Sequence, residues 1–187
     1  MKNLHKQLIK LAEDLHNDMQ KKWDRSLPFP ELLFDRWDSG RKHKFGIGTS
    51  VYHTSYIYGK PQVGKNTWIG PFTILDATGG LTIGDNCSIS AGVHIYTHDT
   101  VAWAVSGGNR KAERKPVAIG NCCYIGAQSV IAKGVVIGDH AVVGANSYVN
   151  KNVPARTVVA GSPARIIGTI MISKNKSISI KYYKKKQ

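Results

Sequence analysis

Histidines and acids near the middle of the chain are the residues best suited to chemistry. Asp99 follows His98 directly, and His94 stands four residues earlier. An imidazole titrates near neutral pH, so His98 could take a proton from an attacking hydroxyl or amine. Asp99 could orient the ring or hold a polar ligand, although adjacent residues on a strand point to opposite faces. The pattern predicts a general base at His98.

Zinc binding is the alternative use of His94 and His98. Zinc held by these two histidines would need a third ligand from another part of the fold. His53 is the only candidate on an earlier stretch of the repeat described below, and its spacing matches poorly. We therefore expect no metal.

A repeat of six residues defines the elements around His98. Gly often follows the repeated aliphatic residue, and a small residue usually lies four positions after it. The aliphatic positions form two series in step: Val51, Ile57, Val63, Ile69, Leu75, Ile83, Ile89 and Ile95, then Ile119, Ile125, Ile131, Ile137, Val143 and Val149. A short fixed period of this kind is typical of a solenoid.

The period predicts an all-β solenoid, a left-handed parallel β-helix, over residues 41–168. The aliphatic residue would point to the axis, the small residue would fit the inner corner, and Gly would permit the backbone geometry of the turn. Three hexapeptides would close a triangular coil of about eighteen residues. Ile119, Ile137 and Ala155 should therefore stack, as should Ile125 and Val143.

Two departures from the period indicate where function should lie. Residues 77–80 include two extra residues, which predicts a small corner bulge. Residues 96–117 form a longer excursion with two glycines and several basic residues. A regular solenoid gains no stability from a projecting loop, and such loops commonly carry function.

The two ends of the chain differ from the repeat. An amphipathic helix is predicted by the spacing of Leu4, Leu8, Leu11, Leu15 and Met19, and a second short helix by residues 31–37. We expect residues 1–40 to form an N-terminal α-helical cap over the open lower end of the β-helix, whose strand edges would otherwise invite association. Residues 169–187 should form a basic tail, in which residues 170–183 could add a strand.

Charge and hydropathy exclude several classes of protein. Part of the net charge of +14 comes from the tail residues Lys174, Lys176, Lys181, Lys184, Lys185 and Lys186. A solvated terminal run explains this charge, so no nucleic-acid partner is expected; attraction to phosphorylated ligands or an anionic membrane surface is the alternative. Residues 1–15 lack the apolar core of a signal peptide, and no apolar run reaches the roughly 18 residues of a membrane span. We expect a cytoplasmic protein with reduced thiols at Cys87, Cys122 and Cys123.

Several motifs over residues 51–168 resemble the hexapeptide-repeat acyltransferases, in the subgroup of galactoside and maltose acetyltransferases. The motifs are Tyr96-Thr97-His98-Asp99 before the loop, residues 116–121 after it, Val153-Pro154 and residues 160–165. The segment 74–108 further resembles acetyltransferases of bacterial surface-polysaccharide pathways such as lipopolysaccharide and O-antigen biosynthesis. These include enzymes that N-acetylate nucleotide-linked amino sugars such as dTDP-4-amino-4,6-dideoxyglucose. The resemblance implies a homotrimer with sites between subunits and acetyl-CoA as co-substrate.

Individual site residues follow from this resemblance and from position. His98 matches the family's catalytic histidine. The family's CoA positions fall on Tyr124, Ala127, Ala145, Asn150, Lys151 and Arg165, although Trp and Ser are frequent in the family where Tyr124 and Ala127 stand. On the acceptor side, the candidates are Asp76 for a sugar hydroxyl or amino group, Tyr96 and Trp103 for stacking, and Asp99. The family's acceptor-site asparagine has no clear counterpart, which argues against galactoside or maltose as the acceptor.

The function expected from the sequence is acetyl-CoA-dependent N-acetylation of a nucleotide-linked amino sugar, with O-acetylation of a sugar as the alternative. Two more distant alternatives remain. The γ-type carbonic anhydrases share the expected fold and bind zinc through three histidines, and a β-helix without a catalytic base could serve as a binding module.

Overall fold

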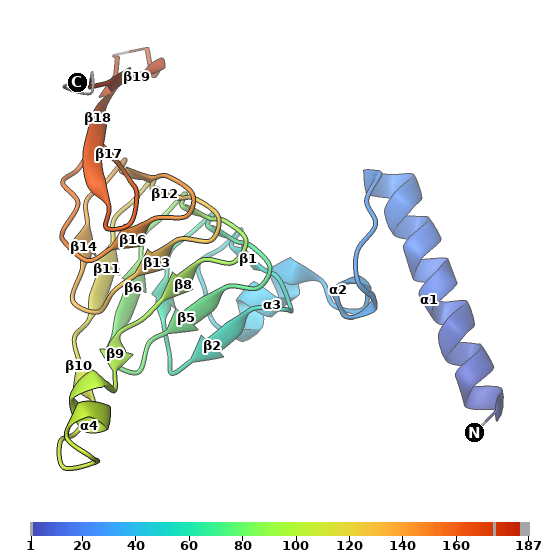
Figure 1. Ribbon diagram of the computed structural model, residues 1–187. Helices are drawn as coiled ribbons and strands as arrows, with labels where there is room; N and C mark the ends of the chain where they lie inside the picture. Colours follow the sequence, from blue (N-terminus) through green and yellow to red (C-terminus); the bar gives the residue numbers. More distant parts are fainter. Residues whose placement is uncertain (1, 174, 184–187) are drawn as a thin grey trace.

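The structure is a computed structural model that describes residues 2–173 and 175–183. Short strands stack coil upon coil into a three-sided β-solenoid, and one long helix stands to its side (Figure 1). This is the predicted left-handed parallel β-helix. Lys174, Lys184, Lys185 and Lys186 of the expected basic tail lie outside the described residues.

Three sheets form the sides of the solenoid. The eight-stranded sheet contains, in spatial order, β1 (Ser50–Val51), β4 (Trp68–Ile69), β7 (Ser88–Ile89), β12 (Tyr124–Ile125), β15 (Val142–Val143), β17 (Thr157–Ala160), β18 (Arg165–Ile172) and β19 (Ile178–Tyr182). The five-stranded sheet contains β2 (Tyr56–Tyr58), β5 (Ile74–Asp76), β8 (His94–Ile95), β13 (Val130–Ile131) and β16 (Tyr148–Val149). The four-stranded sheet contains β3 (Gln62–Val63), β6 (Leu81–Ile83), β11 (Val117–Ile119) and β14 (Val136–Ile137).

The repeated aliphatic residues fill the axis of the solenoid. Leu75, Ile95, Ile125 and Ile131 are each 0% exposed. The predicted stacking of Ile119 on Ile137 and of Ile125 on Val143 is confirmed by the strand register. The prediction that Ala155 stacks next was wrong, because Val153 forms the bridge to Ile137. The last coil is two residues shorter than the regular coil, so Val153 stands where the period would place Ala155.

The repeated glycines have a different role from the predicted one. The left-handed backbone conformation falls three residues after the aliphatic position, on non-glycine residues such as Asn66, Gln128 and Asn146. The glycine itself lies where the next coil comes closest: a Cβ at Gly126 would stand 2.5 Å from the backbone nitrogen of Ala145. Close approach of coils, and not a positive φ, is what requires glycine there.

The N-terminal helices differ in whether they contact the coils. Helix α3 (Arg36–Lys42) packs against β1, whereas α1 (Lys2–Trp23) contacts α2 (Phe29–Leu33). In Figure 1, α1 stands away from the coils, and its Leu4, Leu8 and Leu11 are more than 40% exposed. Helix α3 is therefore the part of the expected N-terminal cap region that lies directly against the first coil.

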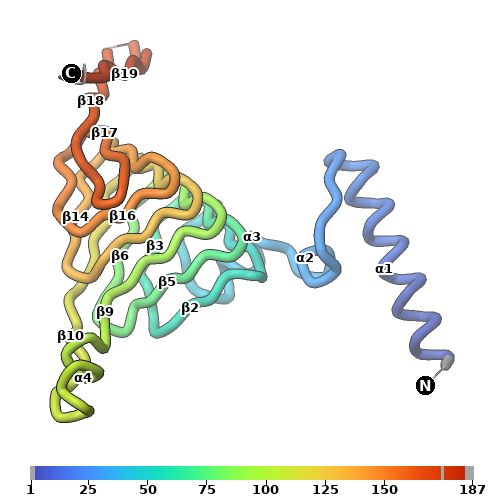
Figure 2. The backbone as a smooth tube through the Cα atoms, viewed as in Figure 1, coloured from blue at the N-terminus to red at the C-terminus, as the bar shows by residue number. Residues whose placement is uncertain are grey.

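Two segments extend from the regular coils (Figure 2). Residues 96–117 project as the predicted loop, with the antiparallel pair β9 (His98–Asp99) and β10 (Glu113–Arg114) at its root and α4 (Val101–Val105) at its tip. At the other end, β18 and β19 form an antiparallel hairpin that continues the eight-stranded sheet, which locates the expected extra strand. Within residues 2–173 and 175–183, no helix has the length and apolar composition to cross a membrane.

Candidate active site

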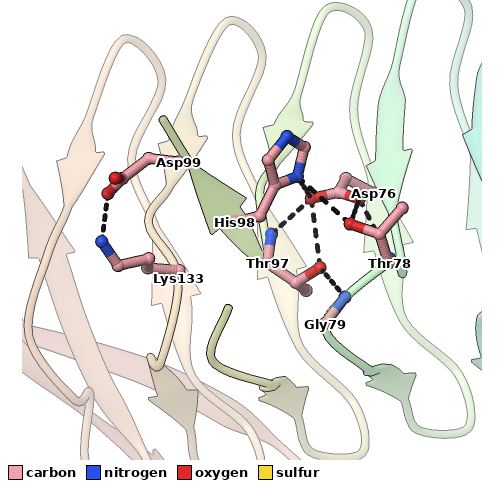
Figure 3. Close-up of polar contacts among 7 residues, drawn as sticks. All are labelled: Asp76, Thr78, Gly79, Thr97, His98, Asp99 and Lys133. Carbon is pink, nitrogen blue, oxygen red and sulfur yellow. Dashed lines mark hydrogen bonds and ion pairs between the residues drawn. The ribbon is translucent and has the colours of Figure 1, made fainter. Parts of the chain in front are cut away.

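His98 and Asp76 meet at the root of the projecting loop. Asp76 ends β5 and His98 begins β9, and the His98 Nδ1 lies 2.7 Å from the Asp76 Oδ2. The Asp76 side chain is 1% exposed, whereas the His98 side chain is 36% exposed. Figure 3 shows the ring with Nδ1 toward the carboxylate and its other nitrogen, Nε2, directed away. Among the described residues, Nε2 has no hydrogen-bond partner, so it is free to meet a substrate.

The Asp76 carboxylate is fully occupied by donors from the protein. Its Oδ1 accepts from the backbone nitrogen and hydroxyl of Thr78, at 3.0 and 2.7 Å. Its Oδ2 accepts from the backbone nitrogen and hydroxyl of Thr97, at 2.8 and 3.1 Å, in addition to His98. Burial by itself would raise the pKa of Asp76, but these hydrogen bonds outweigh it and hold the pKa well below its usual range.

The hydrogen bonds also define the tautomer of His98. The Thr78 hydroxyl has one proton and donates it to Asp76, so at 3.2 Å from Nδ1 it can only accept. An ionised Asp76 is likewise an acceptor. Nδ1 therefore carries a proton, and in the neutral ring Nε2 carries a lone pair. This is the state that a general base needs.

The corner bulge at residues 77–80 makes this arrangement possible. The extra residues let the chain turn back so that Thr78 reaches Asp76, while the Gly79 nitrogen donates to the Thr97 hydroxyl at 2.8 Å. A Cβ at Gly79 would stand 2.4 Å from the Thr97 carbonyl oxygen, and Gly80 has a φ of +99°. Two glycines are therefore required where the bulge passes under the strand that carries His98.

Asp99 points away from His98, as alternation along a strand predicts (Figure 3). Its carboxylate pairs with the Lys133 ammonium, which also lies 2.9 Å from Glu113 Oε2. The hydrogen bond from Lys133 holds the pKa of Asp99 below its usual value. Lys133 comes from the coil above, so this ion-pair cluster ties the root of the loop to the solenoid.

The other acceptor candidates, Tyr96 and Trp103, form no hydrogen bond with His98 or Asp76 among the described residues. The Tyr96 hydroxyl is 3.4 Å from Nδ1 of His94, and the two rings meet edge to face. Trp103 lies on α4 and is 53% exposed. His53, the third histidine considered for zinc, stacks on Phe34. Among residues 2–173 and 175–183, no three His, Cys, Asp or Glu side chains gather as a metal site.

The predicted CoA residues occupy three parts of the surface. Ala127 and Ala145 lie in successive turns between the eight-stranded and five-stranded sheets, linked by a hydrogen bond from the Asn146 nitrogen to the Ala127 oxygen of 2.9 Å. Asn150 and Lys151 are exposed at the opposite edge of the five-stranded sheet, the edge from which the His98 loop leaves. Tyr124 on β12 is 45% exposed, and Arg165 opens β18. One chain therefore does not bring Ala127 and Ala145 to the same edge of the solenoid as His98.

Sequence reasoning missed the two threonines that hold Asp76 and the lysine that holds Asp99. The sequence does contain a signal for Thr78. In Asp-x-Thr before two glycines, the Asp side chain is suited to accept a hydrogen bond from the backbone nitrogen two residues later. Thr97 and Lys133 gave no such signal. Their roles depend on which residues lie side by side in neighbouring coils.

Comparison with known proteins identifies the repeat. Residues 116–151 match the bacterial transferase hexapeptide model of six repeats, and residues 62–97 match the hexapeptide repeat of succinyl-transferase. WcaF of Escherichia coli K12, whose name assigns it to colanic acid biosynthesis as an acetyltransferase, is 32% identical over 147 residues, which cover 74% of this chain and 77% of WcaF. The galactoside O-acetyltransferase of Escherichia coli K12 is 32% identical over 128 residues, which cover 58% of this chain and 63% of that protein.

A solved structure agrees over a longer stretch. A hexapeptide-repeat acetyltransferase of Vibrio cholerae superposes with a TM-score of 0.63 and 28% identity, over 88% of this chain and 91% of that one. Its name includes the same repeat that the spacing predicted here. With the WcaF alignment and the two repeat models, this agreement means that the chain belongs to the hexapeptide-repeat acyltransferases.

Proposed function

We propose that this protein transfers the acetyl group of acetyl-CoA to the amino group of a nucleotide-linked sugar, with His98 as the general base. The observation that carries the proposal is the His98 ring held by Asp76 through Nδ1, with Nε2 unpartnered among the described residues and the side chain 36% exposed. A packed structural histidine would not leave one nitrogen free at the root of a projecting loop. A β-helix that served only as a binding module would have no need of this geometry.

The chemistry follows from that geometry. The neutral acceptor amine attacks the thioester carbonyl carbon with its nitrogen lone pair, and Nε2 takes the proton that this nitrogen loses as the carbon–nitrogen bond forms. The carbon–sulfur bond breaks, and the imidazolium returns the proton to the departing CoA thiolate. The ionised Asp76 stabilises the imidazolium between these two transfers and acts as a positioning residue through His98. A base of this kind contributes roughly 100- to 10,000-fold to the rate.

The site requires a neighbouring subunit in this proposal. Ala127 and Ala145 lie at a different corner of the solenoid from His98, so the pantetheine arm on one chain would meet the base of the next chain in a homotrimer. Ring closure suits a three-sided prism. Lys151 and Arg165 would neutralise phosphates of CoA, and Tyr124 and Asn150 would line its groove. Residues 41–168 would form the acyltransferase domain, residues 1–40 a helical region and residues 169–187 an appended tail, in a cytoplasmic enzyme.

On the acceptor side, Trp103 and Tyr96 remain candidates for stacking on a sugar or base. Asp76 fits a different role from direct sugar binding, because its carboxylate is buried and has five protein donors. Asp99 could bind the acceptor only in competition with Lys133. The relationship to WcaF, whose name assigns it to colanic acid biosynthesis, supports an acceptor from a polysaccharide pathway.

The test is turnover with acetyl-CoA and a panel of dTDP- and UDP-linked amino sugars, with neutral sugars in parallel. Release of the CoA thiol is followed with a thiol reagent, and mass spectrometry locates the acetyl group. Cys122 is exposed, so a reaction without acceptor supplies the blank. We expect N-acetylation of an amino sugar and a loss of at least about 100-fold in His98→Ala.

The matched control is His43→Ala, an exposed histidine beyond α3, which should keep full activity. Full activity in His98→Ala would overturn the assignment of the base. The galactoside O-acetyltransferase relative favours O-acetylation as the second candidate. Turnover on neutral sugars with none on amines would establish that alternative.

A further inference from the structure

A hollow lies on the outer face of the eight-stranded sheet, away from the His98–Asp76 pair. Its volume is about 360 Å³, and it lies between the segment around α3 and the strands β1, β4 and β7. The residues that give it chemical character are Arg25, Arg36, Trp37, Tyr52, Trp68 and Ser88. Two guanidinium groups and three aromatic rings therefore surround one space, together with the hydroxyls of Tyr52 and Ser88.

Arg36 is held in place by a hydroxyl and an aromatic ring. Its Nη1 donates to the Tyr52 hydroxyl at 2.9 Å, and its guanidinium carbon lies 4.4 Å from the centre of the Trp37 ring. Within residues 2–173 and 175–183, neither Arg36 nor Arg25 forms an ion pair. The nearby Glu31 carboxylate is occupied by the backbone nitrogens of His53 and Thr54, at 3.0 and 2.7 Å. An unneutralised planar cation at the edge of a hollow is suited to a phosphate or carboxylate.

Trp68 adds a surface for a flat ring. It is 64% exposed on β4, although large apolar side chains in the coils mostly face the axis. Trp68 pairs in register with Ser88, and Ser88 pairs with Tyr124. Trp68 therefore lies two coils below Tyr124, the proposed CoA residue, in the same outward-facing column of side chains. The hollow lies beside the lower part of this column.

The turn beside the hollow also links it to the turns that carry the proposed CoA residues. Ser90 follows β7 and lines the hollow, and the next residue, Ala91, accepts a hydrogen bond of 3.0 Å from the Gln128 nitrogen beside Ala127. A ligand in the hollow would thus lie along the same edge as the acetyl donor, displaced toward the N-terminal coils. In the proposed trimer, an acceptor bound there would lie beside the donor along this edge.

We infer that this hollow binds the nucleotide part of the acceptor, with a phosphate at Arg36 and Arg25 and the base stacked on Trp68. The inference rests on the proposed function, and it names the group by which the acceptor would be recognised. A nucleotide combines a flat ring with an anion, and the hollow offers an aromatic face beside two guanidiniums. The adenosine phosphates of CoA share this chemistry, so the experiment must separate the two sources.

The test is calorimetric titration of the full chain with dTDP, and separately with CoA, in the absence of any acetyl acceptor. We expect Arg36→Ala and Trp68→Ala each to weaken dTDP binding by at least about tenfold and to leave CoA binding unchanged. Arg36→Lys and Trp68→Phe should give intermediate losses, because each retains part of the contact. The controls are Arg41→Ala, which lies on the same helix and pairs with Asp38, and Tyr56→Ala, which is exposed on another sheet.

Each outcome decides the inference. Unchanged dTDP binding in Arg36→Ala and Trp68→Ala would overturn it, as would a loss of CoA binding in both, which would assign the hollow to the donor. If Arg36→Ala lowers thermal stability, Ser88→Phe fills the hollow without removing the arginine and should also weaken dTDP binding. Binding of dTDP is measured without turnover, so the two proposals can fail separately. If the protein acetylates a sugar but does not bind dTDP, this inference fails and the proposed acetyl transfer stands.

Discussion

Asp76 accepts a 2.7 Å hydrogen bond from Nδ1 of His98, although the two residues belong to strands in successive coils. The contact buries the acid and leaves the outer edge of the imidazole open. It is the feature of the solenoid that most directly indicates chemistry, and the first two predictions concern it.

Asp76→Asn should reduce kcat by on the order of 100- to 10,000-fold with little change in KM for acetyl-CoA. The amide can donate to Nδ1, which would shift the ring proton to Nε2 and remove the lone pair from the reactive side. The measurement is steady-state kinetics on the best acceptor. Asp85→Asn is the matched control, because Asp85 accepts from the Lys65 nitrogen at a different corner. Equal kcat in Asp76→Asn and wild type would contradict the role of Asp76.

The pH dependence of stability should also report on Asp76. Its pKa in the folded protein is held below the unfolded value of about 3.9, so the carboxylate stabilises the fold above that pH and loses this effect as the pH falls through the folded pKa. The melting temperature of Asp76→Asn should therefore lie furthest below wild type near pH 6, and the two should converge toward pH 2. Thermal melts across this range provide the measurement, and a gap that widened on acidification would disprove the assigned direction.

Ala145→Phe should raise the KM for acetyl-CoA by at least about tenfold if pantetheine passes over this turn. A bulky ring would occupy the space beside the Gly126–Ala145 contact, where a small side chain lets a ligand reach the backbone. Ala155→Phe introduces the same ring at the turn between the four-stranded and eight-stranded sheets and should leave the KM unchanged. Equal effects of both substitutions would indicate general disturbance of the coils in place of a CoA contact.

Ile131→Ala should destabilise the solenoid by about 2–5 kcal/mol, because Ile131 is 0% exposed and its removal leaves a cavity at the axis. Val136→Ala on the following strand removes a side chain that is 48% exposed, and it should cost less than about 1 kcal/mol. Denaturant unfolding at a fixed protein concentration compares the two. A smaller loss for Ile131 than for Val136 would be inconsistent with the inward register.

The sequence by itself determined the architecture, because a period of six forces aliphatic residues such as Ile125 and Val143 onto one axis wherever the chain coils regularly. It also located the projecting loop, since the loop interrupts that period. His98 was singled out by its residue type, its place at the root of the loop and the family resemblance. Where the period failed, the prediction failed: Val153 stacks in place of Ala155 because the last coil is shorter.

The tertiary structure decided which residues of different coils meet. Asp76 lies 22 positions from His98 along the chain, and only the strand pairing of β5 with β8 brings the two together. The same reason applies to Lys133 beside Asp99 and to Arg36 near Trp68. Local spacing encodes the coil. Contacts between coils depend on bulges and loop lengths that shift the register, and the register is set only when the whole solenoid is assembled.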